Sequence, residues 1–93
     1  MAAMITPAQC RAARALLQWK MPQLAEASGV SVSTINSFEL ERRAPISANL
    51  KALQSAFESA GVIFIPENGE GPGVRLRKQV ADGAETIEGL ESE

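Results

Sequence analysis

The segment MPQLAEASGVSVSTINSFEL, which begins at Met21, constrains the fold more than any other part of the chain. Its first half ends at Gly29, and glycine readily takes the positive φ that ends a helix. Two residues later, Ser31 can cap a new helix with its hydroxyl group. Apolar residues recur at helical spacing on both sides of this turn. The pattern predicts two short helices, over residues 22–28 and 32–40, that pack at a steep angle.

The flanking sequence predicts one helix before this pair and one after it. Thr6 and Gln9 have the spacing of a capping box, and the proline between them suits the first turn of a helix. We expect this helix to run to about residue 19. Ser47 can cap a further helix that runs to about residue 60 and ends at a glycine.

The residues after the fourth helix have strand character. The run VIFI, residues 62–65, is apolar and β-branched, and the run VRLR, residues 74–77, alternates apolar and basic residues. Turn-forming residues separate them, so we expect a β-hairpin over residues 62–78. Because VIFI is apolar on both faces, either a helix and a loop cover it or it marks a dimer interface, and we favour the interface. The predicted interface comprises Val62, Ile63, Phe64, Ile65, Val74 and Leu76.

Charge is distributed unevenly along the 93 residues, whose net charge is −2. Residues 1–78 hold all nine Lys and Arg with six Glu, which gives +3, whereas residues 79–93 hold five acids and no base, which gives −5. The body is therefore mildly basic. We expect residues 79–93 to be a disordered acidic tail and residues 1–4 to be a flexible N-terminus.

Composition excludes several classes of function. The chain has one Cys and no His, so a Cys/His zinc site and a nucleophile activated by His are both excluded. We expect neither an enzyme nor a cofactor-binding protein. A lone Cys fits a reducing cytoplasm, and no stretch resembles a signal peptide or a membrane-spanning helix.

Four stretches of the chain resemble the Cro/C1-type (Xre-like) helix-turn-helix transcriptional regulators, in particular a small bacterial subgroup with a C-terminal hairpin. They are ITPAQCRAARALLQW, QLAEASGVSVSTINSFE, ANLKALQSAFESAGV and FIPENGEGPGVRLR. The resemblance implies a mainly α fold, with a compact four-helix, lambda repressor-like domain over residues 5–61 and a short β-hairpin. It also implies a sequence-specific regulator, usually a homodimeric repressor, whose third helix reads the major groove of a two-fold symmetric operator in double-stranded DNA.

The resemblance further implies which residues contact DNA. The groove-facing residues share one face of the third helix: Val32, Ser33, Asn36 and Ser37. Asn36 can make two hydrogen bonds to an adenine edge, serine hydroxyls can donate or accept, and Val32 can pack on a thymine methyl group. Contacts to the DNA backbone are expected from Arg14, Lys20, Ser31, Thr34, Arg42 and Arg43.

Three positions depart from the family pattern. Met21 stands where many members have a glutamine that touches the DNA backbone. Val32 stands where a basic residue or glutamine is common, and Glu41 where many members have glycine. Because each lost phosphate contact lowers affinity, we expect modest DNA affinity per monomer and a need for dimerisation.

Other conspicuous residues are expected to have structural roles. Nothing near Cys10 in the sequence would stabilise a thiolate, so it should fill space in the core. Trp19 should lie in the core or between helices. Glu39 is expected to bond Arg14 or Arg11 rather than to read a base.

Two alternatives remain open at this point. The weakly charged third helix also suits a protein-interaction module, such as an antitoxin-like or anti-activator domain that binds a regulatory protein partner. The acidic tail is either a solvated end or a competitor of DNA for the basic body of the domain.

Overall fold

The computed structural model describes residues 5–78, and it contains every predicted element in the predicted order. The elements are α1 (Pro7–Leu17), α2 (Met21–Ser28), α3 (Val32–Glu39), α4 (Ser47–Ser59), β1 (Val62–Ile65) and β2 (Gly73–Leu76). The predicted mainly α class with a small hairpin is therefore confirmed. The predictions for residues 1–4 and for the acidic tail, residues 79–93, lie outside the described residues.

Local hydrogen bonds fix the starts of three helices. Thr6 Oγ1 accepts from the backbone N–H of Gln9, and Thr6 N–H donates to Gln9 Oε1, both at 3.0 Å, which is the predicted capping box. Ser31 Oγ accepts from the backbone N–H of Thr34 at 3.1 Å and caps α3 as predicted. At α2 the Gln23 side chain accepts from Lys20 N–H at 2.7 Å, and the helix begins one residue earlier than predicted.

Two predicted helix boundaries are wrong. α1 ends at Leu17 rather than near residue 19, because Gln18 takes a left-handed conformation with φ of 57°. This turn lets Trp19 N–H donate to the Arg14 carbonyl at 2.9 Å. The capping residue of α4 is Ile46, not Ser47, which is already the first helical residue.

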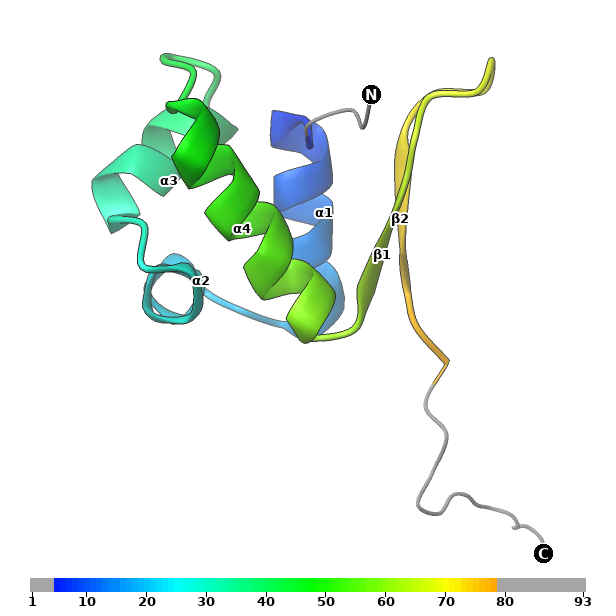
Figure 1. Ribbon diagram of the computed structural model, residues 1–93, viewed down its shortest axis with the longest axis horizontal. Helices are drawn as coiled ribbons and strands as arrows, with labels where there is room; N and C mark the ends of the chain where they lie inside the picture. Colours follow the sequence, from blue (N-terminus) through cyan, green and yellow to red (C-terminus); the bar gives the residue numbers. More distant parts are fainter. Residues whose placement is uncertain (1–4, 79–93) are drawn as a thin grey trace, which may run out of the picture.

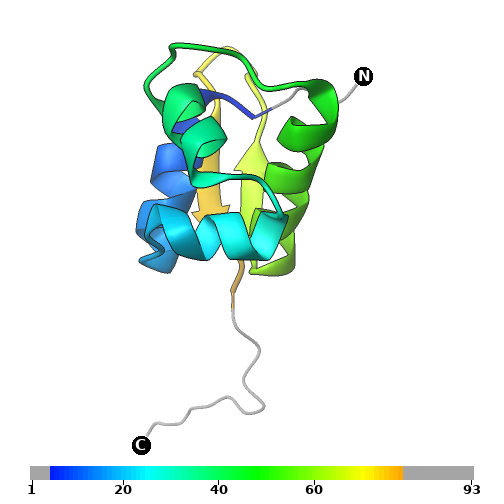
Figure 2. The same cartoon turned by 90° about the vertical axis from the view of Figure 1, so that its left-hand side faces the viewer.

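The elements form three layers. α1 and α4 lie between the α2–α3 pair on one side and the hairpin on the other (Figure 1). Viewed from the α3 side, α2 and α3 lie in front and the two strands lie behind (Figure 2). β2 contacts α1 and β1 contacts α4. The hairpin and α3 therefore occupy opposite sides of the domain.

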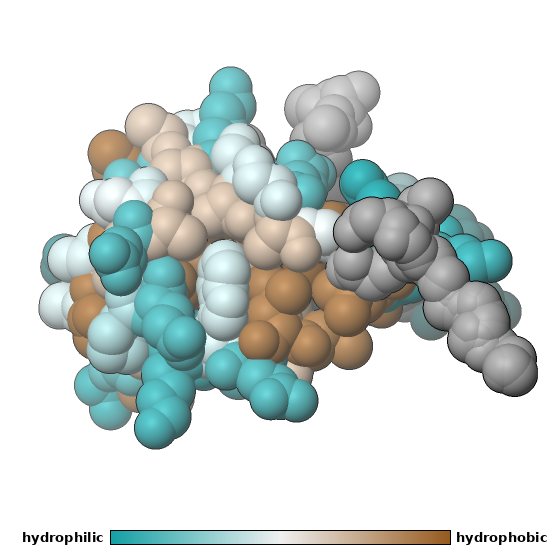
Figure 3. Space-filling view, turned by 90° about the horizontal axis from the view of Figure 1, so that it is seen from below, coloured by the Kyte–Doolittle hydropathy of each residue, from teal (hydrophilic) through white to brown (hydrophobic). Residues whose placement is uncertain are grey.

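The core fills the space between these layers. Phe57 on α4 lies at its centre, stacked on Trp19 with ring centroids 6.0 Å apart and in edge contact with Phe64 at 5.9 Å. Trp19 is thus an inter-helix residue, as predicted. The buried apolar residues extend from the segment before α1 to the first residue of β1: Ile5, Cys10, Ala13, Leu24, Val30, Ile35, Phe38, Leu53, Phe57 and Val62. Seen from below the view of Figure 1, apolar residues gather in one patch on the surface (Figure 3).

The hairpin has two different faces. The strands pair antiparallel, with Val62 opposite Leu76, Ile63 opposite Arg75, Phe64 opposite Val74 and Ile65 opposite Gly73. Residues directly opposite share a face, so Val62, Phe64 and Val74 point toward the helices, where they are buried or pack on the core. Ile63, Ile65 and Arg75 therefore point away from the helices.

The predicted dimer interface residues do not all lie on the same face of the hairpin. Val62 is completely buried inside its own domain, so it cannot contact a second copy. Phe64 and Val74 are also used to cover the core. Of the other predicted interface residues, Ile63 and Ile65 are half-buried, and Leu76, which lies opposite Val62, is 39% exposed.

Candidate nucleic-acid interface

The outer face of α3 carries the four predicted base-reading residues. Val32 is 41% exposed and Ser33 is exposed, whereas Asn36 and Ser37 are half-buried. On the opposite face of the same helix, Ile35 is fully buried in the core. The structure therefore brings the predicted set together on one surface, which is weakly polar and uncharged.

The start of α3 offers hydrogen-bond donors to an anion. Ser31 Oγ donates to Thr34 Oγ1 at 3.0 Å while it caps the helix. The Thr34 hydroxyl keeps its own proton for a further acceptor. The first backbone amides of a helix have no acceptor within the helix, and the helix dipole makes this end positive. The predicted phosphate contacts at Ser31 and Thr34 thus lie where phosphate groups are readily bound.

A small recess lies beside this helix, and the sequence did not predict it. Its volume is about 100 Å³, and it is lined by Ser33, Thr34, Ser37, Arg43 and Pro45. Three of the lining residues carry a hydroxyl group and one carries a guanidinium group. The loop after α3 carries Arg43 back beside the helix, and that path cannot be inferred from spacing along the chain.

Exposed cations precede and follow the α2–α3 pair in the sequence. Arg42 and Arg43 lie in the loop that follows it, and Lys20 lies just before α2. The loop begins with Glu41, whose φ of 60° is the left-handed conformation that glycine favours. The glutamate therefore takes the conformation that the family's usual glycine would supply without strain.

Arg14 is used inside the domain. Its Nε and Nη2 donate to the two carboxylate oxygens of Glu39 at 2.8 and 2.6 Å, and Nη1 donates to the Trp19 carbonyl at 3.1 Å. The Glu39 side chain is only 2% exposed. The structural role predicted for Glu39 is confirmed. The guanidinium group of Arg14 already donates to Glu39 of α3 and to the Trp19 carbonyl in the turn after α1. Arg14 is therefore not among the residues that we propose to contact phosphate groups.

Two further α1 residues join this ion pair. The Cys10 thiol donates to Glu39 Oε2 at 3.1 Å, and Arg11 donates to the Glu39 backbone carbonyl. Burial alone would raise the pKa of Glu39, but the hydrogen bonds from Arg14 and Cys10 and the positive charges of Arg14 and Arg11 outweigh it and lower the pKa. Burial and the neighbouring Glu39 carboxylate raise the pKa of Cys10 above its usual range.

Cys10 is completely buried, which confirms that it is a core residue, and a buried neutral thiol is a poor nucleophile. Its hydrogen bond to Glu39 was missed. Cys10 and Arg14 are four residues apart on α1, so they lie on one helix face, and that spacing could have indicated a shared partner.

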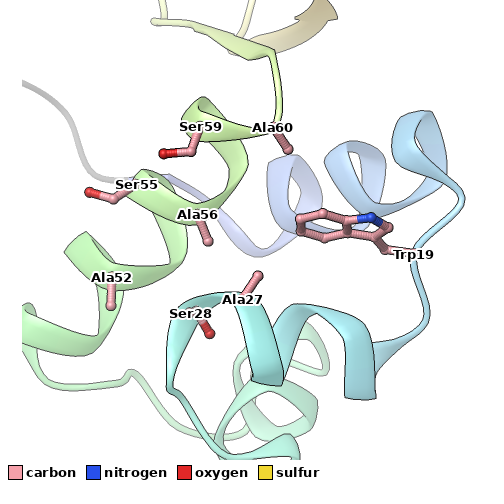
Figure 4. A pocket seen from close by; sticks show the side chains of 8 residues that line it. All are labelled: Trp19, Ala27, Ser28, Ala52, Ser55, Ala56, Ser59 and Ala60. Atoms are coloured by element: carbon pink, nitrogen blue, oxygen red, sulfur yellow. The ribbon is translucent and has the colours of Figure 1, made fainter.

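A shallow groove lies away from α3's outer face. It has a volume of about 460 Å³ between α2 and α4 and is lined by Trp19, Ala27, Ser28, Ala52, Ser55, Ala56, Ser59 and Ala60. The Trp19 ring and the Ala56 side chain point toward the space between the two helices, whereas Ser55 and Ser59 of α4 point away from Trp19 (Figure 4). No charged residue lines the groove, so it offers nothing to a phosphate backbone.

Comparison with known families agrees with this arrangement. The family model described as Helix-turn-helix matches residues 11–60, more than half of the chain, from α1 to the end of α4. A comparison with curated proteins gives no match. Within residues 5–78, the helices are too short or too polar to cross a membrane. The chain therefore belongs to the Cro/C1-type helix-turn-helix family and is, in general terms, a DNA-binding regulator.

Proposed function

We propose that this chain is a sequence-specific transcriptional repressor that acts in the cytoplasm and reads the major groove of double-stranded DNA with α3. The observation that carries the proposal is the outer face of α3, where Val32, Ser33, Asn36 and Ser37 lie together beside exposed cations. A helix with its outer face clear of the domain can enter a groove about 12 Å wide. Flanking cations can supply the electrostatic attraction that the helix itself lacks.

Contacts to bases and contacts to phosphate groups have different roles in the proposed complex. Asn36 and Val32 prefer A·T pairs, because an amide pairs with the adenine edge and a valine side chain packs on the thymine methyl group. The phosphate contacts come from Lys20, Arg42 and the recess beside α3, where Arg43 and hydroxyl groups can surround one phosphate oxygen. Base contacts then specify the sequence, whereas phosphate contacts set the position on the duplex.

Selection of binding sites from random duplexes tests this proposal. The protein should enrich sites with A·T pairs at fixed positions, and a gel shift at low salt should show a preference for those sites over scrambled ones. Replacing Ser33 and Ser37 with Ala should alter the selected sites less than replacing Asn36, because a hydroxyl group discriminates weakly between bases. A pool that shows no enrichment at low salt would contradict the proposal.

The second candidate function is a protein-interaction module. It is favoured by one observation: α3 presents Val32 at 41% exposure and no charged side chain among its four outward residues. Such a surface also suits contact with another protein. A repressor binds selected DNA without any other protein, whereas an interaction module shows no sequence preference in the same selection.

A further inference from the structure

The groove between α2 and α4 has an apolar floor that the rest of the described domain leaves uncovered. Trp19 and Ala56 point toward the space between the two helices, whereas Ser55 and Ser59 point away from Trp19 (Figure 4). Trp19, Ala52 and Ala56 pack against the core but are only partly buried. Burial of such side chains by a further apolar group would be favourable.

The polar group nearest to α3 in this groove already has its partners. Ser28 Oγ donates to the Leu24 carbonyl at 2.7 Å and accepts from Val30 N–H at 3.1 Å. Among the described residues, no charged side chain lines the groove. Its volume of about 460 Å³ lies within the range of about 300–1,000 Å³ that is usual for ligand pockets. The groove therefore suits an apolar occupant rather than a charged one.

The chain leaves the described domain at one end of this groove. Arg77 N–H donates to the Gly61 carbonyl at 2.6 Å, and Gly61 directly follows Ala60, which lines the groove at the end of α4. The end of β2 and the end of α4 therefore lie at the same end of the domain (Figure 1). The fifteen residues of the acidic tail, 79–93, begin two residues after Arg77.

The tail is long enough to reach every part of the groove. The α4 residues that line it run from Ala52 to Ala60, which is about 12 Å along the helix at about 1.5 Å per residue. An extended chain covers at most about 3.3 Å per residue, so the segment from Lys78 to Ile87 can cover up to about 30 Å. Ile87 can therefore reach either end of the groove.

The tail also carries apolar side chains at a suitable spacing. Its three large apolar residues are Val80, Ile87 and Leu90, and its other residues are small or polar. Ile87 and Leu90 are three residues apart, a spacing that places two side chains on one face of a helical turn. These are the side chains of the tail that gain most when they are removed from water.

We propose that the acidic tail packs on its own domain, with Ile87 and Leu90 in the groove against Trp19. Charge does not direct the tail to this place, because residues of both signs are adjacent in the sequence to the lining residues: Lys20, Lys51, Glu26 and Glu58. The contact therefore depends on apolar burial. Tethering gives an effective concentration in the millimolar range, so a contact with a Kd of about 1 mM is about half formed.

This contact differs from competition between the tail and DNA for the basic body of the domain. Attraction between exposed charges is screened at high salt, whereas an apolar contact persists there. The salt dependence of the tail contact therefore separates the two arrangements. The groove contact also does not require that α3 binds DNA.

Quenching of tryptophan fluorescence by acrylamide tests the contact in the full chain, because Trp19 is its one tryptophan. Ile87→Asp with Leu90→Asp should raise the quenching constant about twofold, since a groove that the tail half occupies becomes free. The matched control, Thr86→Asp with Ser92→Asp, adds the same charge at polar positions and should leave the constant unchanged. The difference should be equal at low and high salt. Equal constants for the wild type and the first variant, or a difference confined to low salt, would overturn the inference.

A spin label on the tail locates the contact. Ser92→Cys offers a site for a nitroxide two residues after Leu90, and the native Cys10 is completely buried, which shields it from the reagent. The nitroxide should broaden the NMR signals of the backbone amides of Ala27 and Ala56, on the two sides of the groove, more than those of any other described segment.

A change in the groove itself completes this test. Ala27→Glu places a charge at an exposed lining position and should reduce the broadening. Gln23→Glu adds the same charge to α2 outside the lining, keeps the oxygen that accepts from Lys20 N–H, and should leave the broadening unchanged. Isotope-labelled protein without nitroxide, mixed with nitroxide-labelled protein, shows whether the tail of another copy is involved. Broadening in that mixture, broadening that is strongest at residues 42–43, or no broadening at all would overturn the inference.

Discussion

Arg14 holds both carboxylate oxygens of Glu39, at 2.6 and 2.8 Å, and so joins the first helix to the last residue of α3. The two parallel hydrogen bonds of an arginine–carboxylate pair fix the relative orientation of the two groups as well as the distance between them. The backbone carbonyl of Glu39 is also held, by Arg11. Two arginines of α1 therefore hold the C-terminal end of α3 against the domain.

Loss of the Glu39 carboxylate should destabilise the whole domain. Glu39→Ala leaves Arg14 without its buried partner, and removal of one member of such a pair typically costs about 3 kcal/mol or more. Urea unfolding should show this loss. Glu26→Ala, at an exposed position on α2, is the matched control and should change the free energy of unfolding by less than about 0.5 kcal/mol. Equal losses in the two variants would show that the ion pair contributes nothing specific.

The same pair predicts a pH dependence. The folded pKa of Glu39 lies below its ordinary value of 4.5, so the stability it contributes is present above that value and is lost as pH falls through the folded pKa. The difference in unfolding free energy between the wild type and Glu39→Gln should be constant above about pH 6 and should shrink below pH 4.5. A difference that stays constant down to pH 2 would argue against this assignment.

Gln9 couples the start of α1 to the hairpin. Its side-chain oxygen accepts from Thr6 N–H, and its Nε2 donates to the carbonyls of Ile65 and Gly73 at 3.3 and 2.9 Å. Gln9→Glu keeps the acceptor and loses the donor. Hydrogen exchange of the inter-strand amides should accelerate about fivefold, since a buried hydrogen bond contributes about 1 kcal/mol. Amides in the middle of α1 are the internal control. Unchanged exchange in the hairpin would show that Gln9 does not anchor it.

Glu41 should be replaceable with a gain in stability. A side chain at φ of 60° costs about 1 kcal/mol relative to glycine, so Glu41→Gly should raise the free energy of unfolding by up to that amount. Glu41→Ala removes the same charge but keeps a Cβ atom, and it should bring no comparable gain. Thermal unfolding of both variants separates backbone strain from charge. Equal effects would mean that the charge, not the conformation, matters.

Local signals in the sequence predicted most of the helical framework. The Thr6–Gln9 capping box, the positive φ at Gly29 and the Ser31 cap depend on neighbours within a few residues, and all are present. The early end of α1 depends on Trp19, which must leave the helix to stack on Phe57, 38 residues away. A boundary of that kind is decided by tertiary packing and has no local signal.

In the candidate site, too, local spacing predicted some features, whereas tertiary packing decided others. Helical spacing placed Val32, Ser33, Asn36 and Ser37 on one face. It could not show that Arg14 turns inward, because an arginine near a recognition helix can serve either a phosphate or a buried carboxylate. In the hairpin, the uniformly apolar VIFI run hides which residues face out, and only its pairing with β2 assigns Ile63 and Ile65 to the outer face.

Paired binding measurements on two variants test the central claim, that α3 reads DNA while the flanking arginines hold it. Asn36→Ala should lose about tenfold in affinity for the selected site and little for random duplex, because one base contact is worth 1–3 kcal/mol. Arg42→Ala with Arg43→Ala should weaken binding to both duplexes equally and reduce the salt dependence by about two phosphate contacts. If Asn36→Ala leaves the ratio of the two affinities unchanged, α3 does not read the sequence, and the account is contradicted.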